Sequence, residues 1–145
     1  KGYIEKGKQE GARLVVGGGR PAGLERGYFV KPTVFADVDS RMTIAQEEIF
    51  GPVVSFIDFG DVEDAIRRAN DTRYGLSASV WTSDPARGKV IAARLEVGTA
   101  WVNQHRATSA FVPFGGAKES GLGRQYSALG LKGYMEPEVV SVAKT

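Results

Sequence analysis

The sequence predicts an α/β fold in which a largely parallel sheet is covered by helices. The main observation is the order of segments from residue 53 to residue 103, which alternate as strand, helix, strand, helix and strand. The connections between them are short, and crossovers of this kind join parallel strands in a right-handed sense. The length of 145 residues also suits one domain with a core of its own.

The segment before residue 53 contributes a helix and two strands. Residues 3–12 (YIEKGKQEGA) have a polar, helix-like pattern, although Gly7 and Gly11 lower the helix propensity. RLVV predicts a short strand, and GYFVKPTVFADV predicts another.

A glycine-rich stretch lies between these two strands. Gly17, Gly19 and Ala22 match the G-x-G-x-x-A variant of the dinucleotide-binding fingerprint. Pro21 lies inside the pattern and a strand follows it, so no helix N-terminus is available for a pyrophosphate. We therefore interpret the stretch as a turn.

The central alternation starts with VVSFIDF (53–59), an apolar run typical of a buried strand. Residues 61–70 have apolar side chains at i, i+3, i+4 and i+7 behind Asp61, which predicts a helix with Asp61 as its N-cap. LSASVWT (76–82) alternates as a strand.

The second helix of the alternation follows SDP (83–85), which supplies a cap and a proline at the first helical position. Gly98 is expected to end this helix, and TAWVN (99–103) predicts the next strand. The residues expected on the buried helical face are Ala86, Val90, Ala93 and Val97.

The last part of the chain predicts a loop (104–123), a glycine-diluted helix (123–135) and a final strand that contains EVVSV. This strand has no partner in the chain's own order, and an unpaired edge favours pairing with another chain. The sequence therefore predicts a domain at 1–135, a strand at 136–145 and self-association.

Composition excludes several classes of function. Basic residues (19) and acidic residues (17) are interspersed, which indicates no nucleic-acid footprint, and no apolar run approaches the length of a membrane span. The chain has no cysteine and one histidine, His105, so we expect neither a thiol nucleophile nor a metal site within it. It starts at Lys1 without a leader-like segment, so we expect a cytoplasmic protein cut from a longer one.

QEEIFGP (46–52) places two carboxylates before an aromatic residue and a turn. Glu47 or Glu48 could serve in acid–base chemistry, but such pairs are often solvated or capping. GGAKESGLG (115–123) is not a phosphate-binding P-loop, because Leu122 and Gly123 stand where lysine and serine or threonine are needed. The residues alone indicate an α/β domain with an unplaced site.

Four motifs stand in order along the chain: QEEIFGPV (46–53), ANDTRYGLSASVWT (69–82), GTAWVN (98–103) and PFGGAKESGLGR (113–124). Together they span most of the chain, and they resemble the C-terminal part of the catalytic domain of the NAD(P)-dependent aldehyde dehydrogenases. The terminal GYMEPEVVSV is similar to the last helix and oligomerisation strand of that family.

The resemblance implies a role for the 46–52 motif in binding NAD or NADP. The second glutamate, Glu48, would accept hydrogen bonds from ribose hydroxyls, and Phe50 would pack beside the nicotinamide ribose. Gly51 and Pro52 would shape the turn between the motif and the next strand.

The resemblance also implies that residues 103–114 shape an aldehyde-entry tunnel. Phe114 would form a wall, Asn103 would hold the loop, and His105 and Thr108, with Arg106, would be variable contacts. A packing role for Phe114 is an alternative. Gln125 stands where the family often has glutamate, so a proton relay at that position is not expected.

The family oxidises an aldehyde to a carboxylic acid through a cysteine thioester, with hydride passing to the cofactor. Because the chain has no cysteine, it is expected to hold no catalytic residue and to be inactive without the missing N-terminal part, which carries the nucleotide-binding fold. Two alternatives are a stand-alone, non-catalytic assembly domain and part of a coenzyme A-acylating aldehyde dehydrogenase. The sequence leaves the aldehyde and the choice between NAD and NADP open.

Overall fold

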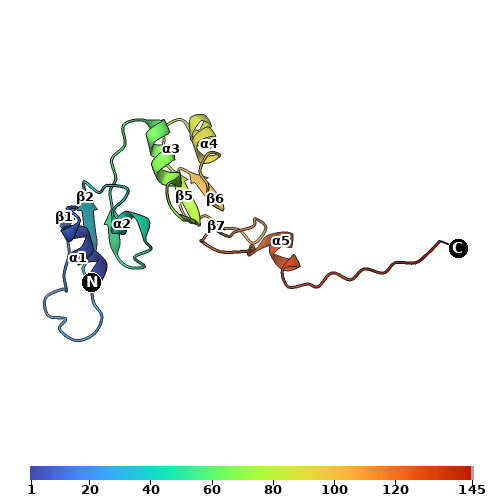
Figure 1. Ribbon diagram of the computed structural model, residues 1–145, viewed down its shortest axis with the longest axis horizontal. Helices are drawn as coiled ribbons and strands as arrows, with labels where there is room; N and C mark the ends of the chain where they lie inside the picture. Colours follow the sequence, from blue (N-terminus) through green and yellow to red (C-terminus); the bar gives the residue numbers. More distant parts are fainter. Residues whose placement is uncertain (145) are drawn as a thin grey trace. The chain divides into compact units, whose positions relative to one another are not determined.

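The computed structural model describes residues 1–144, which form a mixed α/β structure (Figure 1). The chain divides into two compact units, one from Lys1 to Asp71 and one from Thr72 onward. In chain order the elements are α1 (Gly2–Gln9), β1 (Arg13–Val16), β2 (Thr33–Ala36), α2 (Thr43–Gln46), β3 (Val53–Ser55), α3 (Val62–Asn70), β4 (Tyr74–Gly75), β5 (Ser77–Val80), α4 (Pro85–Ala92), β6 (Thr99–Val102), β7 (Ala117–Lys118) and α5 (Ser127–Lys132).

The first unit contains a three-stranded sheet in the order β1-β2-β3. β1 is antiparallel to β2, with Arg13 opposite Ala36, whereas β2 is parallel to β3, with Thr33 opposite Val53. The connection from β2 to β3 contains α2, which gives the chain the length that a parallel crossover needs, whereas β1 and β2 are joined by a loop that simply reverses direction.

The core of this unit lies between the sheet and the two helices α1 and α2. Phe35 of β2 is fully buried, and Ile4 of α1 and Ile44 of α2 pack in the same cluster. Gly7 allows this packing, because a Cβ atom there would lie 2.9 Å from Cδ1 of Ile44. The glycine that weakens α1 as an isolated helix therefore lets α1 approach α2 closely.

Helix α3 confirms the predicted cap. The Asp61 carboxylate accepts a hydrogen bond of 2.8 Å from the backbone N–H of Asp64, which satisfies one of the free donors of the first turn. The predicted buried strand before it is wrong in length and burial. β3 ends at Ser55, and the side chains of Val54, Phe56 and Phe59 are 52%, 57% and 60% exposed, because no described element covers them.

The second unit contains two two-stranded sheets. β5 and β6 are parallel and are joined through α4, and β4 is antiparallel to β7. The expected single, largely parallel sheet is thus wrong for the residues described: the strands form three small sheets with both kinds of pairing. Each parallel pair has a helix in its connection, α2 in the first unit and α4 in the second, whereas an antiparallel pair needs none.

Helix α4 begins as predicted but buries another face. The Asp84 carboxylate caps it, and Pro85 is its first residue. The helix ends at Ala92, and Val90, expected on the buried face, is 64% exposed. Gly88 is buried instead, because a Cβ there would lie 2.7 Å from Cγ1 of Val102, so the smallest residue of the helix faces β6.

Of the two C-terminal expectations, the helix needs a correction and the strand is not confirmed. α5 is confined to Ser127–Lys132, shorter than the predicted 123–135, and residues 136–144 form no strand; Thr145 lies outside the described residues. Val139, Val140 and Val142 are at least 79% exposed. A strand needs hydrogen bonds from a neighbouring strand, and within the described chain none pairs with this segment.

None of the described helices has the length and apolar character needed to cross a membrane.

Paired carboxylates make the stability of the first unit dependent on pH. Hydrogen bonds from Thr43, Arg13, Arg41 and Arg68 lower the pKa values of Glu10, Asp37, Asp39 and Asp64, respectively. A carboxyl group whose pKa is lower in the folded state stabilises the fold above its unfolded pKa, and this contribution is lost as the pH falls through the folded pKa.

We expect the free energy of unfolding to decrease from about pH 5 to about pH 2, where these groups take up protons. Urea denaturation at a series of pH values would measure it. An Asp39→Asn/Asp64→Asn double variant should show a shallower decrease, and the same steepness in the double variant would contradict the assignment.

Candidate functional site

Glu48 and Phe50 lie on the loop between α2 and β3. We call residues 47–52 the cofactor loop, because the sequence resemblance implies that they bind NAD or NADP. Both side chains are exposed, Phe50 to 93%. Phe50 has a φ angle of 49°, in the left-handed region that a bulky residue rarely adopts. Strained backbone of this kind concentrates at functional sites, and here it accompanies an aromatic ring that no part of the unit covers.

The two adjacent glutamates of this loop differ in their contacts. Glu47 accepts a hydrogen bond of 2.9 Å from the phenol of Tyr3 through Oε2. The Glu48 carboxylate makes no hydrogen bond or ion pair within residues 1–144, so both its oxygens can accept hydrogen bonds from a ligand. Glu48 is therefore the glutamate of this loop whose two carboxylate oxygens are both free of hydrogen bonds within residues 1–144.

Hydrogen bonds fix the helix that leads into the cofactor loop. The side-chain amide of Gln46 donates to the backbone carbonyl of Ser40 (2.6 Å) and to that of Asp71 (2.8 Å). Ser55 donates to the carbonyl of Ile44 (3.1 Å). The loop therefore leaves a helix that is held from several sides.

In the second unit, His105 and Phe114 come together on Trp101 of β6. The Phe114 ring is stacked on the indole at 6.5 Å and 22°, and the His105 ring meets it edge-on at 5.6 Å and 73°. Trp101 is 6% exposed, and its Nε1 donates to the carbonyl of Ala107 (2.9 Å). His105 Nδ1 lies 3.0 Å from the hydroxyl of Ser79. These three rings are the Trp101 cluster.

Trp101 was not singled out from the sequence. Trp101 is the central residue of TAWVN, and an aromatic residue at the centre of a buried strand is also common in ordinary core packing. The sequence therefore offers no reason to assign it a further role. The structure gives it a second role, because it supports two of the five residues that the resemblance places at the aldehyde-entry tunnel.

Two further expected residues, Asn103 and Thr108, behave differently. The side-chain amide of Asn103 makes two hydrogen bonds of 2.8 Å to the backbone of Thr82, accepting from its N–H and donating to its carbonyl. These bonds hold the end of β6 beside the segment that follows β5. Thr108 is exposed, and no interaction joins it to the Trp101 cluster in the described part of the chain.

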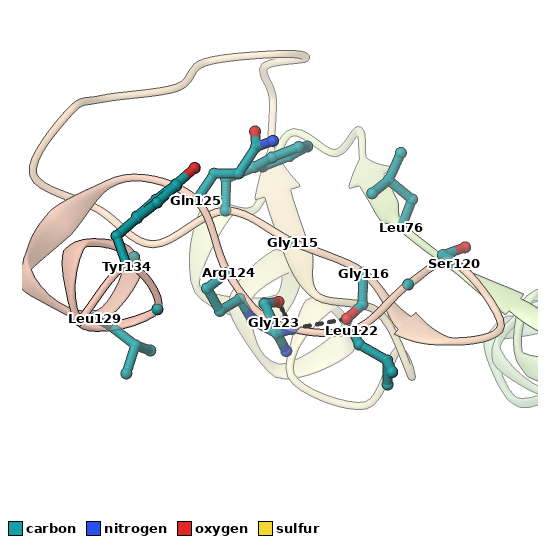
Figure 2. A pocket seen from close by; sticks show the side chains of 14 residues that line it. Leu76, Gly115, Gly116, Ser120, Leu122, Gly123, Arg124, Gln125, Leu129 and Tyr134 are labelled. Carbon is teal, nitrogen blue, oxygen red and sulfur yellow. Dashed lines mark hydrogen bonds between the residues drawn. The ribbon is translucent and has the colours of Figure 1, made fainter. Parts of the chain in front are cut away.

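A hollow of about 570 Å³ lies between the 114–125 segment and α5 (Figure 2). Phe114 is one of its lining residues. Figure 2 shows Leu129 and Tyr134 at the left and Leu76 and Ser120 at the right. The Arg124 guanidinium donates to the carbonyls of Gly116 (2.8 Å) and Gly123 (2.7 Å), which closes the segment into a compact turn. The lining is mostly apolar side chains and glycine backbone, without a carboxylate.

The chain has few groups for metal or nucleophilic chemistry. No group of three histidine, cysteine or carboxylate side chains that could hold a metal occurs among residues 1–144, and the sequence contains no cysteine. The residues that the resemblance assigns to binding lie on the cofactor loop and in or near the Trp101 cluster.

Comparison with known proteins gives a consistent result. The model of the aldehyde dehydrogenase family matches residues 1–140. The chain is 50% identical over 142 residues to the betaine aldehyde dehydrogenase of Brucella anthropi and 52% identical over 141 residues to that of Rhizobium etli. Each match covers 97% of this chain and 29% of the relative, so the chain spans less than a third of their length.

Solved structures agree with these relatives. The structure of Mycobacterium tuberculosis aldehyde dehydrogenase complexed with NAD⁺ has a TM-score of 0.89 and 54% identity, covering 92% of this chain and 27% of that one. The NAD⁺ complex of aldehyde dehydrogenase from Bacillus cereus has a TM-score of 0.88 and 50% identity, covering 93% and 27%.

The resemblance seen in the sequence is therefore confirmed at the level of the family. A match to 29% of a relative does not place the chain at the C-terminal end of that relative, so this part of the expectation is not confirmed. With 140 of its residues matched by the family model, the chain belongs to the aldehyde dehydrogenase family.

Proposed function

We propose that the chain is part of an NAD-dependent aldehyde dehydrogenase, to which it contributes a cofactor-binding loop and contacts to the aldehyde. The observation that carries this proposal is the exposed Glu48–Phe50 pair on the cofactor loop of a chain whose relatives are aldehyde dehydrogenases. NAD, when bound, would accept the hydride from the substrate. The NAD⁺ complexes among the similar structures favour NAD, and no observation favours NADP.

Glu48 fits this role because its two carboxylate oxygens have no partner in residues 1–144, and they can accept hydrogen bonds from two adjacent ribose hydroxyls. Phe50 supplies an exposed ring that could pack beside the ribose. The hydrogen bonds of Gln46 and Ser55 hold the preceding helix, which reduces the ordering that binding would require.

Contacts to the aldehyde are proposed for Phe114, His105, Asn103 and Thr108. Phe114 and His105 share the support of Trp101, whereas Asn103 fixes the start of the loop through Thr82. Betaine aldehyde is the first substrate to assay, because the relatives at 50–52% identity carry that name.

The nucleophilic cysteine would come from residues outside this chain, which has none. We accordingly propose that residues 1–145 on their own are inactive and that the complete enzyme is a homo-oligomer, with residues 136–145 as an oligomerisation strand. Residues 1–135 would form part of the catalytic domain of that enzyme. The exposed Val139, Val140 and Val142 support a role in pairing.

Replacing Glu48 with glutamine in the full-length enzyme tests the proposal. The amide keeps one acceptor oxygen and loses the charge and the second acceptor, so we expect KM for NAD to rise about tenfold, equivalent to about 1.4 kcal/mol of binding. Steady-state rates at saturating aldehyde would measure it.

The matched control is Glu25→Gln, which makes the same charge change on an exposed carboxylate. An unchanged KM for NAD in Glu48→Gln, or an equal rise in the control, would rule out the assigned role of Glu48.

A further inference from the structure

Helix α1 makes contacts along the whole length of α2. At one end, the Glu10 carboxylate accepts two hydrogen bonds from Thr43, the first residue of α2: 2.8 Å from its backbone N–H to Oε2 and 2.6 Å from its hydroxyl to Oε1. The N-cap residue of α2, Met42, makes no side-chain cap of its own. Glu10, 33 positions away in the sequence, thus satisfies a backbone N–H at the start of α2 that an N-cap side chain would usually satisfy.

The middle and the far end of α2 contact α1 as well. Gly7 lies against Ile44, where a Cβ would come within 2.9 Å of Cδ1. The Tyr3 phenol donates to Oε2 of Glu47, the residue directly after α2 (2.9 Å). Successive turns of α1 therefore contact the start, the middle and the end of α2.

The charge on Glu10 strengthens this arrangement. The hydrogen bond from the Thr43 hydroxyl lowers the pKa of Glu10, and Lys6 Nζ lies 3.5 Å from its Oε1, so the carboxylate is ionised at neutral pH. Hydrogen bonds to an ionised acceptor are stronger than those to a neutral one.

A helix of four residues has almost no stability of its own, so the orientation of α2 depends on what surrounds it. Glu48 follows Glu47 directly, and Phe50 is two residues further. A contact that holds Glu47, such as the hydrogen bond from Tyr3 to its carboxylate, therefore restricts the direction in which these two side chains leave α2.

We propose that Glu10 and Tyr3 are positioning residues for the cofactor loop: they hold the two ends of α2 and so keep Glu48 and Phe50 oriented toward the cofactor. This inference rests on the proposed function of Glu48. It assigns a role in NAD binding to a helix that itself offers no group to the cofactor.

The experiment uses the full-length enzyme with Glu10→Ala, Tyr3→Phe and the control Glu5→Ala. Glu5 is on the same helix and pairs with Lys8 at 2.9 Å. Hydrogen exchange should become about tenfold faster across residues 43–50 in Glu10→Ala, because the Thr43 amide loses its acceptor. KM for NAD should rise about three- to tenfold, with kcat and KM for the aldehyde within about twofold. The control should change none of these.

A purely structural role would instead lower the melting temperature without separating KM for NAD from KM for the aldehyde. Glu10→Gln guards against a folding failure, since its amide oxygen still accepts one hydrogen bond from Thr43, and it should give intermediate values. Combining Glu10→Ala with Glu48→Gln should raise KM for NAD by less than the product of the two single effects, because both act through one contact.

Unchanged exchange across residues 43–50 in Glu10→Ala would overturn the inference outright. Faster exchange with an unchanged KM for NAD would also overturn it, provided that Glu48→Gln raises that KM, and the proposed function would then stand. If Glu48→Gln has no effect, the proposed function fails, and the inferred role in NAD binding fails with it. Faster exchange in Glu10→Ala would then show only that Glu10 stabilises α2.

Discussion

Replacing Phe35 with alanine is expected to lower the free energy of unfolding by about 3–5 kcal/mol, the range for removing a large aromatic side chain from a core. Phe35 has 0% exposure and lies in the middle strand of the first sheet. Ile4 and Ile44 pack in the same cluster, so the substitution removes contacts to both helices and leaves a cavity that they cannot fill without moving.

Urea denaturation of the full-length enzyme would measure this change. Phe35→Leu serves as the graded control, because it keeps much of the volume and should cost clearly less than the alanine variant. If both variants lower the free energy of unfolding equally, or if the alanine variant lowers it by less than about 1 kcal/mol, Phe35 does not contribute to core stability as its burial indicates.

The second large effect is expected at Gly98, which precedes β6. A Cβ at this position would lie 1.7 Å from the carbonyl oxygen of Gly115, and the Gly98 N–H also donates to the carbonyl of Gly75 (3.0 Å). Because the obstructing atom belongs to the backbone, a side-chain rotation cannot relieve the clash. Gly98→Ala should therefore cost about 1–3 kcal/mol or more.

Gly60→Ala is the matched control for Gly98→Ala. No atom lies within 4 Å of a Cβ at Gly60, so the same change of residue should be close to neutral there. Thermal melting of both variants beside the wild type would compare them. If Gly98→Ala and Gly60→Ala have the same melting temperature, the backbone at Gly115 can move away at little cost.

Local signals in the sequence were the most dependable. The caps at Asp61 and Asp84 were predicted because a cap and its helix are adjacent in the chain, and both are present. The buried face of α4 was predicted wrongly, because the periodicity of Val90 and its neighbours suggested an apolar stripe. The packing is instead decided by the close approach of Gly88 to Val102, which is distant in sequence.

The candidate site shows the same division. Glu48 and Phe50 were predicted through a family motif, and the composition alone left their roles open. Neither Glu10 nor Trp101 could be singled out. Glu10 acts on a residue 33 positions away, and Trp101 gains its role from rings that approach it in space. Contacts across such separations leave no periodic or local pattern to read.

The boundary between the two compact units has a consequence for the synthesis of the protein. All residues of the first unit, from Lys1 to Asp71, precede those of the second. Ribosomes release the chain from its N-terminus, and domains generally fold as units in that order. The strands of the first sheet, α1 and the cap on α2 therefore emerge before Trp101, so a defect at Phe35 or Glu10 would leave their apolar surface open to chaperones and proteases while the second unit is still being made.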